Sequence, residues 1–488
     1  MKKTYLILIG IFLLSVLFQG YFALQIDQFS SDKAYFNLRH SEYIKDNFSP
    51  MFYDEMSYGG NYIIDTHIWH YFLALFALVL PVVLVYKILP ILIASSIVFI
   101  VYLITKQITV NESAAMFGAG VSAFIPTFLA LALNQISVYV VYVPLMLVLL
   151  YTLMDIKRRI GYFILLSFLL VLLQPMNFLV FFTLIIFLIL AVSESLPIKT
   201  EMYEGISFFV LLTILVNLIL FKNIYMSAGL EAIWKNIPQE LLSNFFRSFD
   251  LIGLVYNIGL IPLVLGFIGF GIGISTERKK MIYVFSAVIL ADIFLLTIRL
   301  IPYNEGLMFL AIMLIISSTI AIDKMIEYLK ITKASRYLYL IVSGVIIIAV
   351  VSLLIPATMN ANDLIHNGVT NEEIEALTWI KDNTPENSVI MGNVFEGNLI
   401  LEVAYRTNVL DTSFLLAEDL YHDMYTIYTT ESLYKAGVLL KQHNVDYVYF
   451  SDKTKNMFNV EELKYTRDGS CFEQVFENER TKIYKVVC

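Results

Sequence analysis

The sequence predicts a polytopic α-helical membrane domain followed by a compact α/β domain. Hydrophobic residues make up 58% of the 488-residue chain, far more than a soluble core of this length would use. The long apolar runs stop before Ala357, and charge changes at the same point. The first 356 residues carry 20 acidic and 22 basic side chains, whereas the remainder carries 21 and 11. We therefore predict domains at 1–356, with a first external loop at 25–66, and at 357–488.

Charge and cysteine content exclude two classes of function. The acidic tail argues against nucleic acid as a partner, because phosphates require a basic surface. Cys471 and Cys488 are the only cysteines, so a cysteine metal cluster is excluded. The two can form one disulfide if the tail lies outside the cell.

Eleven apolar runs in the first domain are long enough to be membrane spans. The first resembles a signal peptide, but no small-residue cleavage site follows it, so we interpret it as a retained span. The runs are 5–24, 85–105, 114–133, 136–154, 160–173, 178–192, 205–221, 251–274, 281–300, 307–322 and 337–355.

The basic residues set the orientation. A twelfth apolar run, Ile68 to Leu84, is interpreted as a re-entrant or interfacial helix, because a full crossing would export Lys157 to Arg159. Arg278 to Lys280 is then cytoplasmic too, with Lys87 and Lys222 as exceptions at outer span ends. This predicts a multi-pass cell-membrane protein with a cytoplasmic N-terminus. Three segments share the extracytoplasmic face: Asp27 to Thr66, Lys222 to Asp250 and the tail.

The tail alternates helical and strand patterns. Capping residues and helical spacing predict a helix from Thr370 that ends at Thr384-Pro385. Two more helices are expected at 397–406 and 431–443. Short apolar runs predict strands at 388–391 and 445–450.

The first external loop is rich in carboxylates. Asp32 lies close to the end of the first span, and Asp54 and Glu55 precede a Gly59-Gly60 turn whose amides can face an anion. Carboxylate oxygens suit Mg²⁺ or Mn²⁺, and two of them beside the membrane can hold such an ion against a lipid phosphate. The alternative is a surface loop whose charged side chains are solvated and have no catalytic or binding role.

Other polar residues are weaker candidates. His67 and His70 share a helical face, but this pair is more often an interfacial anchor than a metal site. Asp292 lies in the middle of a span, which indicates either a functional acid or one that faces a water-filled cavity. Arg299 and Glu305 mark the outer ends of two successive spans, where a cation can meet a lipid-linked phosphate.

Two stretches resemble the catalytic subunits of archaeal oligosaccharyltransferases and related GT-C fold enzymes. Asp32-Lys-Ala-Tyr35-Phe-Asn-Leu-Arg39 is similar to their D-x-x-Y-[YF]-x-L-R segment after the first span. The segment from Val389 to Asp411 follows their pattern around WWDYG. The resemblance implies a GT-C-like membrane domain and sugar transfer from a polyprenyl phosphate or pyrophosphate on the outer face.

The resemblance also implies roles for residues. Asp32 is expected to be the base or metal-bound carboxylate, and Arg39, Arg299 and the Gly59-Gly60 turn are expected to contact the phosphate. Asp54 and Glu55 of the same acidic loop are further candidate catalytic acids. Asn134 stands where the family has a second metal-binding acid, so it is expected to contact metal and substrate, and Glu305 is nearest to a later-loop glutamate. Asn393 to Phe395 replace WWD, which makes recognition of an asparagine sequon unexpected.

We therefore predict a membrane glycosyltransferase that uses a lipid-phosphate-linked sugar and a glycan, lipid or protein acceptor. Three alternatives stay open. The chain is otherwise an oligosaccharyltransferase that recognises protein without WWD, a transporter or flippase of lipid-linked sugars that uses Asp292, or a relative that has lost catalysis. No internal symmetry of the kind common in transporters is evident.

Overall fold

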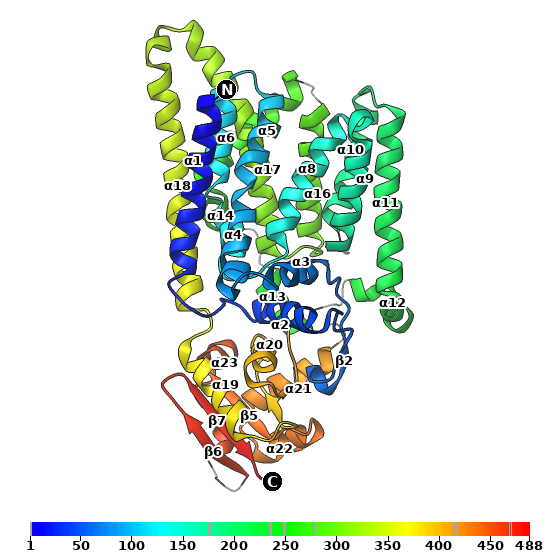
Figure 1. The fold of residues 1–488 in the computed structure, drawn as a ribbon, viewed down its shortest axis with the longest axis vertical. Helices are drawn as coiled ribbons and strands as arrows, with labels where there is room; N and C mark the ends of the chain where they lie inside the picture. Colours follow the sequence, from blue (N-terminus) through cyan, green and yellow to red (C-terminus); the bar gives the residue numbers. More distant parts are fainter. Residues whose placement is uncertain are drawn as a thin grey trace.

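The computed structural model describes residues 2–173, 177–233, 237–246, 250–277, 280–413, 417–467, 469 and 471–488. Figure 1 shows a bundle of long helices at one end of the molecule and a sheet domain at the other, with the helices Asp32–Asn47 and Ile68–Ala77 between them. Arg278 and Lys279, which we predict to be cytoplasmic, lie outside the described residues, as does part of the 222–250 loop.

The first two-thirds of the chain is helical apart from one small hairpin. Its strands are β1 (Tyr53–Asp54) and β2 (Asn61–Tyr62). Its helices are α1 (Lys2–Ala23), α2 (Asp32–Asn47), α3 (Ile68–Ala77), α4 (Leu89–Ser95), α5 (Ile97–Ile108), α6 (Glu112–Ser122), α7 (Pro126–Ala132), α8 (Tyr139–Met154), α9 (Ile156–Leu173), α10 (Phe178–Ser193), α11 (Thr200–Leu220), α12 (Lys222–Ala228), α13 (Leu242–Phe245), α14 (Leu251–Ile258), α15 (Leu260–Ile272), α16 (Lys280–Thr297), α17 (Tyr303–Ile331) and α18 (Leu338–His366).

Each of the eleven predicted spans contains helix, but not every helix is long enough to cross a membrane. Among the described residues, six helices are sufficiently long and apolar, or eight if two bent pairs are each counted as one span. The pair α6 and α7 bends by 51°, and the pair α14 and α15 by 95°. Pro126 begins α7, and Gly259 separates α14 from α15 with a φ of 85°. The chain is a multi-pass membrane protein, and eleven crossings stay a prediction.

Helix α17 forms the centre of the bundle, and α15 packs closely against it. A Cβ added to Gly269 would lie 1.9 Å from the carbonyl oxygen of Ser317, and one added to Gly266 would lie 2.7 Å from that of Leu314. Small residues at a helix contact let two backbones approach in this way. The 94% burial of the most apolar stretch of α17 follows from this packing.

Helix α3 does not cross the bundle. It has ten residues, too few to span, and it lies across the direction of the bundle helices beside α2 (Figure 1). This position agrees with the re-entrant or interfacial interpretation of the run from Ile68.

The surroundings of Lys87 explain why it is an exception to the rule that basic residues lie on the cytoplasmic side of the membrane. Its side chain is buried, and Nζ donates to the carbonyl oxygens of Ala23, Ile26 and Gln28, just after α1. A lysine that satisfies carbonyl groups at a helix end is not a free charge on a loop.

The C-terminal domain is a five-stranded mixed sheet with helices around it. The strands follow the order β4-β3-β5-β7-β6, with β3 parallel to β4 and β5, and β7 antiparallel to β5 and β6. The strands are β3 (Val389–Met391), β4 (Thr407–Asn408), β5 (Tyr447–Ser451), β6 (Phe472–Glu477) and β7 (Thr481–Val486). The helices are α19 (Asn371–Asn383), α20 (Gly397–Leu399), α21 (Glu418–Thr429), α22 (Leu433–Gln442) and α23 (Asp452–Phe458).

The elements predicted for the tail occur close to their expected positions. Thr370 caps α19 through a reciprocal pair of hydrogen bonds with Glu373, as the capping pattern indicates. Cys471 and Cys488 form a disulfide. The proposed boundary at residue 356 falls inside α18, because this helix continues past Pro356 to His366 before the chain enters the sheet domain.

Candidate functional site

Helix α2 presents Asp32 at the junction of the two parts of the molecule. Ser31 adopts an extended conformation and its hydroxyl accepts a hydrogen bond from the backbone N–H of Ala34, so the helix begins at Asp32. A carboxylate in the first turn is favoured by the helix dipole. One side of α2 faces the bundle and the other faces α20 of the C-terminal domain (Figure 1).

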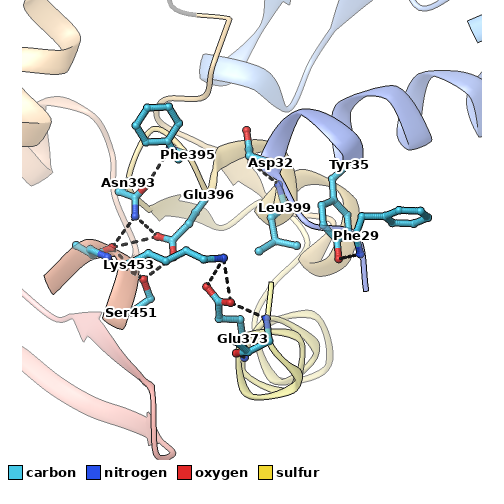
Figure 2. Close-up of polar contacts among 12 residues, drawn as sticks. Phe29, Asp32, Tyr35, Glu373, Asn393, Phe395, Glu396, Leu399, Ser451 and Lys453 are labelled. Carbon is cyan, nitrogen blue, oxygen red and sulfur yellow. Dashed lines mark hydrogen bonds and ion pairs between the residues drawn. The ribbon is translucent and has the colours of Figure 1, made fainter. Parts of the chain in front are cut away.

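Asp32 is 6% exposed, and the C-terminal domain satisfies both of its oxygens. Oδ1 accepts from the backbone N–H of Leu399 at 2.9 Å. Oδ2 accepts from Nδ2 of Asn398 at 2.7 Å and from the Thr412 hydroxyl at 3.2 Å. Figure 2 shows Asp32 above Leu399, on one side of the segment 393–399 of the C-terminal domain. A carboxylate offers about four lone-pair sites, so one remains open to a further donor.

Burial makes Asp32 a much stronger base than an exposed aspartate. Loss of hydration raises its pKa from 3.8 to about 7, and the nearby charge of Asp411 acts in the same direction. The hydrogen bonds from Asn398, Leu399 and Thr412 oppose this rise without cancelling it. A carboxyl group with a pKa near neutrality can take a proton in one step and release it in another.

Arg39 and Asp54 form a buried ion pair. Both terminal nitrogens of the guanidinium contact the carboxylate, with Nη2 to Oδ1 at 2.8 Å, and the two side chains are 9% and 3% exposed. Oδ1 of Asp54 also accepts from the N–H of Met56 at 3.0 Å. Glu55 points to solvent. Asp54 therefore fastens the β1–β2 hairpin to α2, and the two predicted acids have separate surroundings.

Asn134 belongs to a strained turn between α7 and α8 that holds the first loop. Asn134 has a φ of 54°, and Ile136 has a φ of 50°. A positive φ is rare for a β-branched residue such as Ile136. The Asn134 carbonyl accepts from Ser30 N–H at 2.9 Å, and its Nδ2 donates to the Ala23 carbonyl at 3.1 Å. The Ile136 carbonyl accepts from Asn37 Nδ2 and Trp69 Nε1. Ser30, which donates to the Asn134 carbonyl, lies two residues before Asp32 in the sequence, so these bonds hold the turn close to the start of α2.

No metal cluster is evident within the described ranges. No group of three His, Cys, Asp or Glu side chains is placed to hold an ion there. Asp32 accepts N–H and O–H hydrogens with both oxygens, whereas the Asn134 Oδ1 atom is buried without a hydrogen bond. A metal held by Asp32 and Asn134 stays a prediction.

The two predicted histidines join a third in a buried cluster. His67 and His70 approach through their Nδ1 atoms at 3.3 Å, and His70 Nε2 bonds to Asn37 Oδ1 at 2.9 Å. His40 stacks beside them and bonds to the Phe36 carbonyl. Burial lowers the pKa of His40 to about 4 and that of His70 well below its ordinary value. The three rings are therefore neutral, and they pack α3 against α2.

The remaining candidates lie on the bundle side. Arg299 is exposed, with a φ of 58°, just after α16. Glu305 lies in the first turn of α17, within electrostatic range of Lys33, the neighbour of Asp32. Asp292 is fully buried in α16, and neither carboxylate oxygen has a hydrogen bond among the described residues. No described contact joins these residues to Asp32.

A buried network of hydrogen bonds around Glu396 lies on the side of the segment 393–399 that faces away from Asp32 (Figure 2). Ser451 donates to Oε1, while Asn393 Nδ2 at 2.6 Å and Thr454 at 3.0 Å donate to Oε2. Burial raises the pKa of Glu396 to about 8, and the charge of Glu373 adds to the rise. Lys453 pairs with Glu373 at 3.0 Å, close by.

Sequence reasoning missed Asn398, Thr412 and Glu396. Asn398 and Glu396 fall inside the segment that resembles the family pattern, so that segment was a usable signal. Nothing in the sequence indicates that the main-chain N–H of Leu399 meets a side chain 367 residues away.

The arrangement as a whole is similar to two groups of membrane enzymes of known structure. The oligosaccharyltransferase of Archaeoglobus fulgidus in the apo form superposes with a TM-score of 0.71 at 14% identity, over 98% of this chain and 74% of that one. The same organism's oligosaccharyltransferase AglB, in complex with an inhibitory peptide and a dolichol-phosphate, gives 0.69 at 14% identity over 92% and 70%.

A third similar structure is ArnT from Cupriavidus metallidurans bound to undecaprenyl phosphate. It gives a TM-score of 0.62 at 9% identity and covers 98% of both chains. The Archaeoglobus enzyme has also been solved in complex with zinc and sulfate, with a TM-score of 0.65 at 14% identity over 98% of this chain and 73% of that one. No family model and no curated protein matches the sequence. At such low identity the likeness shows the fold, and the chain has the GT-C fold with a C-terminal globular domain.

The buried ion pair gives a first prediction. Asp54→Ala should lower the free energy of unfolding by about 3–5 kcal/mol, because it leaves the Arg39 guanidinium buried and unpaired. Glu55→Ala is the matched control, since that neighbouring acid is exposed. Thermal melts of the reconstituted protein measure both variants, and equal melting temperatures would contradict this role of Asp54.

Glu396 gives a second prediction, on pH. Its folded-state pKa of about 8 lies above the ordinary 4.5, so the folded state holds the proton more tightly than the unfolded state. Stability contributed by this proton is lost as pH rises between these two values. Glu396→Gln should flatten the fall in melting temperature between pH 5 and pH 8. Parallel pH curves for variant and wild type would show that Glu396 is not buried in its protonated form.

Proposed function

We propose that this protein is an integral membrane glycosyltransferase that moves a sugar from a polyprenyl-phosphate-linked donor to an acceptor hydroxyl on the extracytoplasmic face. The observation that carries the proposal is the buried Asp32 carboxyl, with a pKa of about 7, at the junction of α2 and the C-terminal domain. The GT-C fold supports it, because the similar structures include complexes with dolichol-phosphate and undecaprenyl phosphate.

Asp32 acts as the general base in this proposal. The acceptor hydroxyl donates to the lone pair of Asp32 that the C-terminal domain leaves open. Its oxygen then forms a bond to the anomeric carbon while the bond from that carbon to the phosphate oxygen breaks. The acceptor proton passes to Asp32, and the lipid phosphate leaves with the bonding electron pair. Attack opposite the leaving phosphate inverts the anomeric centre.

Positive charge stabilises the leaving phosphate. The two candidate arginines differ in whether they are free to provide it. Arg39 uses both terminal nitrogens on Asp54, so its part is to position the first loop. Arg299 is exposed at the outer end of α16 and is the better placed cation. Mg²⁺ or Mn²⁺ bound at Asp32 and Asn134 would add charge for the same purpose, and the step above does not depend on it.

Transfer to an asparagine sequon is disfavoured by the residues that replace WWD. Asn393 spends its amide on Glu396, Thr454 and the Phe395 N–H, and Val394 is fully buried. Two of the three side chains are therefore buried in the fold, and the Asn393 amide is occupied by bonds within the protein. The Cys471–Cys488 disulfide supports an extracytoplasmic position for the C-terminal domain, because disulfides persist in oxidising compartments.

Asp32 gives the direct test of this function. Asp32→Asn in lipid-reconstituted protein should lower transfer from a radiolabelled polyprenyl-phosphate hexose into a membrane glycan fraction by about 100-fold or more. Transfer by the wild type should rise with pH through about 7 as Asp32 loses its proton.

Thr412→Val serves as the control for the hydrogen bonds to Asp32. It keeps the carboxylate but removes a donor that lowers the Asp32 pKa, so transfer should persist with its pH midpoint moved upward. Unchanged transfer by Asp32→Asn would refute the assignment of the base.

A further inference from the structure

A cavity of about 460 Å³ opens between the two parts of the molecule. It lies on the Glu396 side of the segment 393–399, and its lining combines polar side chains with apolar surface. Its walls come from α13, the end of α18, the turn between β6 and β7, and α23. The volume lies within the range of about 300–1,000 Å³ that is usual for small-molecule sites. None of the residues assigned to catalysis lines it.

Three asparagines face this cavity from three separate elements. Asn244 lies on α13, Asn367 follows α18, and Asn456 lies on α23. All three are exposed, and none makes a side-chain hydrogen bond with another described residue. An amide offers both donors and an acceptor, so these three walls match a ligand whose groups donate and accept at once. Sugar hydroxyls have that property.

Phe395 adds an apolar face to one wall. Its ring is half-buried and lies 6.2 Å from the ring of Phe245. Figure 2 shows the ring pointing away from the Glu396 network. An aromatic face beside unpaired amides suits a pyranose ring, which has one apolar face of C–H groups and a rim of hydroxyls.

Among the described charged residues around the cavity, Arg480 has no direct ion pair, and the charge of Glu372 acts on it from a longer distance. Asp452 pairs with Lys455 at 2.6 Å, and Glu373 pairs with Lys453. The Arg480 side chain is exposed at the rim and makes no hydrogen bond or ion pair within the part of the chain that the structure describes. A guanidinium in this position can bind a sugar carboxylate through two hydrogen bonds.

We propose that this cavity is a saccharide-binding site that prefers acidic sugars and holds the acceptor glycan, which rests on the proposed glycosyl transfer. A lipid chain would leave the three amides without hydrogen bonds, at a cost. An extended peptide is usually bound along an exposed sheet edge, and the lining contains none. The segment 393–399 contributes Asn393 and Phe395 to this cavity and binds Asp32 on its other side, so one short segment connects a bound glycan with the proposed base.

Binding of two trisaccharides to the full-length protein in lipid nanodiscs tests the proposal. The probes are a glucose trisaccharide and a galacturonic acid trisaccharide, measured by saturation-transfer NMR and calorimetry at low salt. Both should bind, the acidic one about tenfold more tightly, which is the low end of what one added charge-assisted hydrogen bond contributes. Arg480→Gln should remove this preference, and Asn456→Ala should weaken both ligands by about fivefold.

Asn383→Ala is the matched control, an exposed helical asparagine of the same domain that does not line the cavity. Its binding should equal that of the wild type. If neither trisaccharide binds, or if Asn456→Ala and Arg480→Gln bind as the wild type does, the proposal is overturned.

Asp32→Asn separates this proposal from the proposed reaction. It should bind both trisaccharides normally while transfer is lost. Normal transfer by this variant, together with lost binding in the Asn456 and Arg480 variants, would keep the saccharide site and refute the assigned base. Lost transfer together with unaffected binding in those two variants would refute the saccharide site and keep the base.

Discussion

Three hydrogen bonds to one carboxylate connect the two ends of this chain. Asp32, in the first external helix, accepts from Asn398, Leu399 and Thr412 of the C-terminal domain. Burying a carboxylate is costly unless donors replace its lost water, so the domain has to sit against α2 for Asp32 to be tolerated. The remaining desolvation raises the Asp32 pKa to about 7. These hydrogen bonds therefore both attach the domain to α2 and set the pKa of the proposed base.

The membrane side contributes the opposing support. The left-handed residues Asn134 and Ile136 direct two carbonyl groups toward the first loop and α3. Ser30 and Asn37 of the loop and Trp69 of α3 donate to them. Such strain persists only where the surroundings fix it. The first loop is thus held from both sides, by the α7–α8 turn and by the C-terminal domain. In the proposed reaction, this double attachment keeps Asp32 in position between the lipid-linked donor and the acceptor.

The helices of the bundle and most elements of the tail could be predicted from the sequence, because apolar run length, capping residues and alternation are local signals. The short resemblance around Asp32 also indicated the fold. The partners of Arg39 and Asp32 could not be predicted, because those contacts join distant segments and one uses a backbone N–H. Asp54 illustrates this limit: its place in an acidic loop made it a candidate catalytic acid, and only the fold shows that it pairs with the buried Arg39 guanidinium. The cavity beside Phe395 depends likewise on three elements that are far apart in sequence.

Burial of Asp32 by the C-terminal domain should make this carboxyl titrate near neutrality. A ¹³C-NMR titration of carboxyl-labelled aspartate in the reconstituted full-length protein measures this, with the Asp32 signal assigned by its absence in Asp32→Asn. We expect a midpoint near pH 7 for this signal. A midpoint near 4, the value of an exposed aspartate, would show that the domain does not bury Asp32.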